Sequence, residues 1–109
     1  MQTAREDIIT TGDYCLIPLR RTAYAIIDKD DLSRISKHKW FLKKSKTTSY
    51  AARKYTINGL TRYVLMHRVI TNCPKDKVVH HINHNSLDNR KCNLVVVTPK
   101  EHNQPEFRL

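Results

Sequence analysis

The chain has 109 residues, enough for one compact domain with a modest hydrophobic core. Its 20 Lys and Arg residues outnumber its 10 Asp and Glu residues, giving a formal net charge of +10. This excess indicates a polyanionic partner, nucleic acid before an anionic membrane surface. No segment resembles a transmembrane span or a signal peptide, so we expect a cytoplasmic protein with no membrane partner.

The positive charge is unevenly distributed along the chain. Residues 20–77 contain 15 Lys and Arg residues and four Asp residues, whereas residues 78–109 contain four basic and three acidic residues. Residues 78–109 also contain four of the six histidines. We interpret this division as a basic binding region followed by a region that carries the chemistry.

The first predicted elements are two strands and a helix. Residues 14–19 and 22–27 are short apolar segments, which predict a pair of strands. Asp30 or Asp31 is a suitable N-cap for a short helix over residues 31–38.

A further strand is predicted to begin at Trp40, which we expect to anchor the core. Residues 50–57 and 60–66 then predict a β-hairpin around Asn58-Gly59, a dipeptide that a two-residue type I′ turn favours. Basic side chains on such a ribbon could meet phosphates in a DNA groove. The candidates are Arg53, Lys54 and Arg62.

The last third predicts the order strand, loop, strand, helix. A short helix over residues 66–71 precedes it, and VVHHI and NLVVV are the two strands. Thr98 and Glu101 form the sequence pattern of a capping box, which marks a helix start. This order can bring His80 and His102 together on one cation.

The residues VHHINHNSLDNRKCNLVVVTPKEHN, 79–103, resemble the HNH motif, also called the ββα-metal motif. Upstream, KHKW, the predicted hairpin, MHRVI and NCPKDK are similar to segments of homing-type HNH endonucleases of phages and bacteria. The resemblance covers about residues 22–104 and implies a bacterial or phage-infected cell.

The resemblance implies a role for each matched residue. His81 corresponds to the general base, and Asn93 to the asparagine that holds the loop and helps to orient that base. His80 and His102 correspond to the two protein ligands of one divalent cation. Asn89 matches the D-N-R pattern of the loop and is expected to be structural.

Two residues depart from the usual pattern of the family. His84 stands where Gly is common, so it is expected to cost backbone strain or to reach a phosphate. His80 replaces the common Asp, and two imidazoles suit more metals than Mg²⁺ alone. We expect one Mg²⁺ or Mn²⁺ ion, with Ni²⁺, Co²⁺ and Zn²⁺ as further candidates. Arg90 and His84 are added as candidate DNA contacts.

Together these inferences predict an α+β fold. A polar segment (1–12) precedes a basic antiparallel β-sheet region with short helices (13–72), and an HNH ββα-metal motif (73–109) packs with that region as one unit. The predicted function is metal-dependent cleavage of double-stranded DNA, giving 5′-phosphate and 3′-hydroxyl ends. One alternative is a non-catalytic DNA-binding protein of the same fold. Another is a structural zinc module built on Cys73, Cys92 and histidines. Whether the chain dimerises is left open.

Overall fold

The computed structural model describes residues 8–103, so the first seven residues of the predicted N-terminal segment lie outside its described part. The architecture is α+β, with antiparallel sheets and a few short helices, which confirms the predicted class. No helix in the described range has both the length and the apolar character needed to cross a bilayer.

The first sheet contains three antiparallel strands in the order β1-β2-β3. β1 is Ile9–Thr10, β2 is Tyr14–Arg20 and β3 is Ala23–Asp28. Alternate side chains of β2 are buried, as expected when one face of a strand packs on a core. The predicted pair 14–19 and 22–27 corresponds to β2 and β3, whereas β1 was not predicted.

The helix predicted over residues 31–38 is shorter than expected. A 3-10 turn, Lys29–Asp31, leads into α1, Leu32–Ile35. Asp31 is the N-cap residue, but its side chain makes no cap hydrogen bond. Its buried carboxylate instead accepts hydrogen bonds from Arg34 at 2.9 Å and from Lys91 at 3.0 Å.

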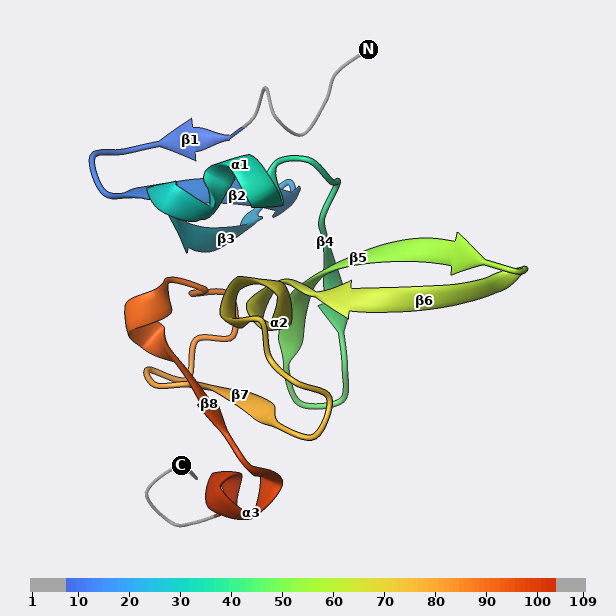
Figure 1. Ribbon diagram of the computed structural model, residues 1–109. Helices are drawn as coiled ribbons and strands as arrows, with labels where there is room; N and C mark the ends of the chain where they lie inside the picture. The colour runs from blue at the N-terminus through green and yellow to red at the C-terminus, as the bar shows by residue number, and fades with distance from the viewer. Residues whose placement is uncertain (1–7, 104–109) are drawn as a thin grey trace.

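The second sheet has the order β4-β5-β6, with β4 at Phe41–Lys44, β5 at Ser49–Ile57 and β6 at Leu60–Leu65. Asn58 and Gly59 have φ values of 50° and 77°, the left-handed pair that a type I′ turn requires. Beyond the short β4 strand, β5 and β6 continue as a two-stranded ribbon that projects from the body of the molecule (Figure 1).

The chain then forms α2, Met66–Thr71, and a third sheet of two strands. These strands are β7, Val78–His81, and β8, Leu94–Val97, and α3, Pro99–His102, follows them. The capping box predicted at the start of α3 is present, with both of its hydrogen bonds formed. The order strand, loop, strand, helix is therefore the observed one (Figure 1).

The hydrophobic core lies between the first two sheets and the helices α1 and α2. Trp40 is buried there, as predicted, and its Nε1 donates a hydrogen bond to the carbonyl oxygen of Ile35 at 2.7 Å. The buried members of this core are Cys15, Ile17, Leu19, Ala25, Ile27, Ile35, Trp40, Ala51, Met66 and Ile70.

The loop between β7 and β8 is attached to the first sheet. The backbone nitrogen of Ile26 donates to the carbonyl oxygen of Leu87 at 2.8 Å, and that of Asn89 donates to the carbonyl oxygen of Ile26 at 2.7 Å. The backbone nitrogen of Lys91 donates to the Asp28 carboxylate at 2.8 Å. β3 therefore holds the loop that follows the paired histidines.

Candidate active site

Five of the six histidines line one cleft of about 630 Å³ between α2, β5, the third sheet and α3. They are His67, His80, His81, His84 and His102. Helix α2 supplies the first, the end of β7 supplies the next two, the following turn supplies His84, and α3 supplies the last. The predicted convergence of β7 and α3 is therefore present.

His80 is buried and lies between the rings of His84 and His102. Its ring centroid is 5.5 Å from that of His102 and 5.3 Å from that of His84. Burial and the neighbouring imidazoles, His102 first, lower the pKa of His80. A neutral imidazole is the form that binds a metal ion, so these surroundings favour the ligand form of His80.

His81 points to the other side of the strand and is oriented by an asparagine. Its Nε2 lies 2.8 Å from Oδ1 of Asn89, so that Nε2 is the donor and the lone pair of the neutral ring is on Nδ1. Burial lowers the pKa of His81, and the hydrogen bond to Asn89 and the charge of Asp88 partly oppose this effect. The ring is therefore neutral near pH 7, the state that a proton acceptor needs.

Asn89 is fully buried, and its position depends on the first sheet. Its backbone nitrogen is bound to Ile26 of β3, which directs its side chain toward His81. Asn89 was expected to be structural, and its side chain also contacts the candidate base directly. Nothing in the local sequence indicates this contact. It joins the loop residue Asn89 to His81 of β7, and it depends on the bond of Asn89 to Ile26 of β3.

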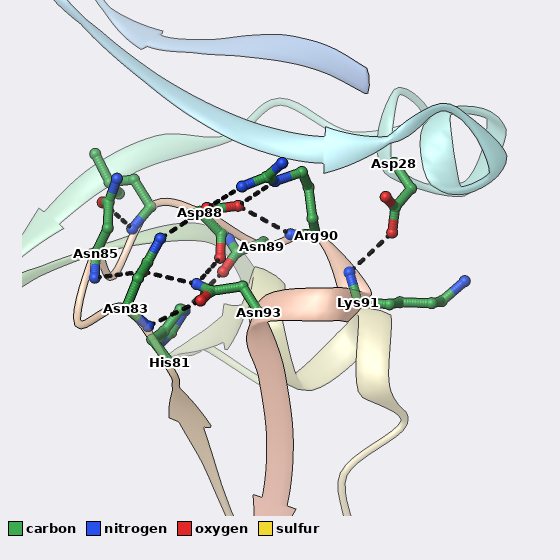
Figure 2. Close-up of polar contacts among 10 residues, drawn as sticks. Asp28, His81, Asn83, Asn85, Asp88, Asn89, Arg90, Lys91 and Asn93 are labelled. Carbon is green, nitrogen blue, oxygen red and sulfur yellow. Dashed lines mark hydrogen bonds and ion pairs between the residues drawn. The ribbon is translucent and has the colours of Figure 1, made fainter. Parts of the chain in front are cut away.

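Asn93 makes hydrogen bonds across the loop between β7 and β8. Its Nδ2 donates to the backbone oxygen of Asp88 and to Oδ1 of Asn83, each at 2.9 Å, and its Oδ1 accepts from the backbone nitrogen of Asn83. Asn83 Nδ2 in turn donates to the Asp88 carboxylate at 3.0 Å. Figure 2 shows these contacts converging below the loop, next to His81.

His67 is a site residue that sequence reasoning did not single out. Its ring centroid is 5.0 Å from that of His81, in an edge-to-face arrangement, and 5.3 Å from the ring of Tyr50. It is buried, and its Nδ1 has no partner among the described residues. Burial, followed by the charges of His81 and Arg68, lowers the pKa of His67 to about 3.

The imidazoles of His80 and His102 are the candidate donors for a metal ion. His80 and His102 both line the cleft with neighbouring rings, which fits a cation that shares two imidazoles and takes its other ligands from water and phosphate. Within residues 8–103, no group of three or more His, Cys, Asp or Glu side chains is arranged to hold a metal ion. The structural zinc alternative, which needs three or four such ligands, therefore finds no support in this range.

The predicted DNA contacts lie in two places. Arg53, Lys54 and Arg62 are on the β5–β6 ribbon, and His84 and Arg90 are in the loop after β7. Arg90 is already engaged, because its Nε and Nη2 bind the Asp88 carboxylate at 2.8 and 2.7 Å (Figure 2). These hydrogen bonds lower the pKa of Asp88. Arg90 thus has a structural role beside the predicted one.

A family model described as HNH endonuclease matches residues 64–104, which include α2 and the whole of the third sheet and α3. The chain is also 30% identical over 90 residues to the "Uncharacterized HNH endonuclease L560" of Acanthamoeba polyphaga mimivirus. This match covers 82% of the chain and 46% of the relative, so the chain spans about half the length of that protein. No solved structure gives a significant match.

These matches and the order of the elements define a nuclease-type module. Residues 64–104 of the chain belong to the HNH endonuclease family.

Proposed function

We propose that this chain is a metal-dependent endonuclease that hydrolyses phosphodiester bonds of double-stranded DNA and leaves 5′-phosphate and 3′-hydroxyl ends. The observation that carries the proposal is the cleft, in which a strand, a turn and two helices bring five histidines together. The net charge of +10 supports a polyanionic substrate. The family match supports a nuclease.

In this mechanism His81 is the general base. Asn89 accepts the hydrogen of His81 Nε2, so Nδ1 can take a proton from the attacking water. A divalent cation held by His80 and His102 would neutralise charge on the phosphate and stabilise the leaving 3′-oxygen.

The other assigned residues position these groups or the substrate. Asn93 keeps the loop in the conformation that presents Asn89 to the base. The ribbon residues Arg53, Lys54 and Arg62, with His84 and Arg90 of the loop, meet phosphates of the duplex.

The experiment is cleavage of a supercoiled plasmid in the presence of Mg²⁺, Mn²⁺, Ni²⁺, Co²⁺ or Zn²⁺, with EDTA as the metal-free control. We expect nicked or linear product with at least one metal, and ends that DNA ligase can rejoin. His81→Ala should lower the single-turnover rate about 10²–10⁴-fold while DNA binding in EDTA is retained. His38→Ala is the matched control, because His38 is exposed and lies outside the cleft.

The outcomes separate the candidate functions. Plasmid binding without cleavage under any of these metals would support a non-catalytic DNA-binding protein that keeps the HNH fold. Cleavage that survives His81→Ala at the wild-type rate would remove His81 from the mechanism.

A further inference from the structure

The tip of the β5–β6 ribbon is apolar and exposed. Four large side chains of the ribbon are exposed to solvent: Tyr55 by 39%, Ile57 by 55%, Leu60 by 54% and Tyr63 by 51%. Ile57 and Leu60 immediately flank the Asn58-Gly59 turn, and neither belongs to the hydrophobic core of the described residues. Aliphatic side chains at the end of a projecting ribbon have no evident role in the stability of the fold.

The strand register groups these residues. Ile57 pairs with Leu60 directly across the ribbon, so their side chains are neighbours on one face and form a single apolar edge. Two residues back, Tyr55 pairs with Arg62, and alternation places that pair on the same face. The apolar edge is therefore followed, toward the body of the molecule, by an aromatic ring and a cation.

The charge of the segment that contains the ribbon indicates the chemical class of its partner. Residues 32–75 contain 11 Lys and Arg residues and no Asp or Glu. A polyanion is therefore the surface that this ribbon can approach without repulsion. A protein partner with an apolar groove would leave this uniform positive charge unused.

The dimensions of the ribbon fit a duplex. Residues 53–57 of β5 pair only with β6, and at about 3.3 Å per residue this free part of the ribbon is roughly 16 Å long. The grooves of B-DNA are about 7.5–8.5 Å deep, and the major groove admits a two-stranded ribbon. The tip can thus reach the base pairs while the cations nearer the body stay at the level of the phosphates.

We infer that Ile57 and Leu60 form a wedge that inserts between adjacent base pairs of the bound duplex, unstacking and bending it. Proteins that bend DNA from its minor groove insert aliphatic side chains between base steps in a comparable way. This inference rests on the proposed DNA-binding function but not on catalysis. Insertion between base pairs unwinds the helix, and that unwinding can be measured without knowing the target sequence.

The test is relaxation of a closed circular plasmid by a metal-independent type IB topoisomerase in EDTA, where the nuclease reaction is absent. With saturating wild-type protein, the topoisomers recovered after protein removal should have a lower linking number than those of the protein-free control. Ile57→Ser/Leu60→Ser should abolish this shift. The variant should still retard the plasmid on a gel within about tenfold of the wild-type affinity, because its phosphate contacts remain.

Two further variants control for folding and for surface polarity. Thr56→Ala/Thr61→Ala changes the adjacent cross-strand pair on the opposite face and should keep the full shift. Ile57→Leu/Leu60→Met keeps the edge apolar and should also keep it. Circular dichroism of all variants checks that the hairpin is retained.

Each outcome decides between occupants of the tip. Retardation by the wild type without a change in linking number would overturn the wedge and leave the proposed function standing. No retardation at all would overturn both. Equal shifts for wild type and Ile57→Ser/Leu60→Ser would also overturn the wedge. The wedge would also be overturned if Ile57→Ser/Leu60→Ser lost only its binding to phosphatidylglycerol vesicles. The same holds if the variant lost only its self-association, as measured by sedimentation.

Discussion

At the scale of single residues, the surroundings lower the pKa values of three histidines of the cleft, His67, His80 and His81. His67 is the most deeply affected, because it is buried beside His81, Arg68 and the ring of Tyr50. These surroundings make its protonated form unfavourable. His67 therefore links the stability of the fold to pH.

The first prediction follows from the lowered pKa of His67. Its folded-state value of about 3 lies below the ordinary value of 6.5, so the unfolded chain binds more protons between these limits. The contribution of His67 to the free energy of unfolding is fully present above pH 6.5. It is lost as the pH falls, by about 1.4 kcal/mol per pH unit. Urea unfolding of wild type and His67→Gln at pH 7 and pH 5 measures it. The wild type should lose about 2 kcal/mol more than the variant. Equal losses would mean that another group carries the acid sensitivity.

A second residue-scale prediction concerns His80, which stands where the family commonly has Asp. A carboxylate is a harder donor than imidazole, so His80→Asp should raise the affinity for Mg²⁺ relative to Mn²⁺. Calorimetric titration of the DNA-free protein with each ion measures this ratio independently of activity. His84→Asp is the control, because it adds the same charge to the cleft at a neighbouring ring. An unchanged ratio in His80→Asp, or the same change in both variants, would place His80 outside the ligand set. His102→Ala should weaken binding of both ions.

At the scale of elements, the loop between β7 and β8 is the part that the asparagines organise. Its side-chain contacts run from Asn83 and Asn93 to Asp88, and its backbone is bound to β3 at Ile26. Removing the Asn93 side chain would leave the buried backbone oxygen of Asp88 without its donor, which costs about 1–3 kcal/mol. The concentration of asparagines in this loop thus has a structural cause that does not depend on the proposed catalytic role.

The third prediction concerns the turn that begins this loop. His84 has φ of 64°, the left-handed region, which an L-residue occupies at a cost of about 1–2 kcal/mol. His84→Gly should therefore be at least as stable as the wild type, and His84→Val should lose about 1–2 kcal/mol because a β-branched side chain tolerates this region least. Urea unfolding gives the order.

The control for this turn is an exposed loop residue that is not in the left-handed region. Lys46 meets this condition, and Lys46→Gly should not stabilise the protein relative to Lys46→Val. If His84→Gly is clearly less stable than the wild type, then the imidazole makes a stabilising contact that outweighs the backbone strain.

Elements with local signals could be predicted from the sequence. Asn58-Gly59 requires only its own two φ angles, and the capping box joins Thr98 to a residue three positions away. The helix after Asp31 begins as predicted but ends at Ile35, whose carbonyl oxygen accepts a hydrogen bond from the Trp40 indole instead of continuing the helix. Competition from this side chain of the core explains the difference.

The candidate site could be predicted only as far as its motif extends. The neighbourhood of His80 and His102 follows from the order of elements and was expected. The contact of Asn89 with His81 and the position of His67 depend on how β3 and α2 pack against the third sheet. Asn89 and His81 are only eight residues apart, but the bond from Asn89 to Ile26 and the contact of His67 with His81 come from tertiary packing, so no local pattern indicates the arrangement.

At the scale of the whole molecule, charge and shape act together. The described residues extend over 46 × 41 × 24 Å, and the basic ribbon projects from the side of the body (Figure 1). No acidic residue occurs between residues 32 and 75, so the field of this part has one sign. We expect this surface to hold the duplex through its phosphates while the cleft acts on one strand.

The last prediction is the salt dependence of DNA binding by the ribbon. Each phosphate neutralised should contribute about 0.9 to the slope of log affinity against log salt. The variant Arg53→Ala/Lys54→Ala/Arg62→Ala should therefore bind all duplexes more weakly and with a shallower slope, as measured by fluorescence anisotropy in EDTA from 50 to 300 mM salt. The control removes three exposed charges from the first sheet and the turn after it: Arg20→Ala/Arg21→Ala/Lys29→Ala. Because net charge falls equally in both variants, a loss confined to the ribbon variant assigns the grip to β5 and β6. Equal losses would instead show that the duplex responds only to the total charge of the protein.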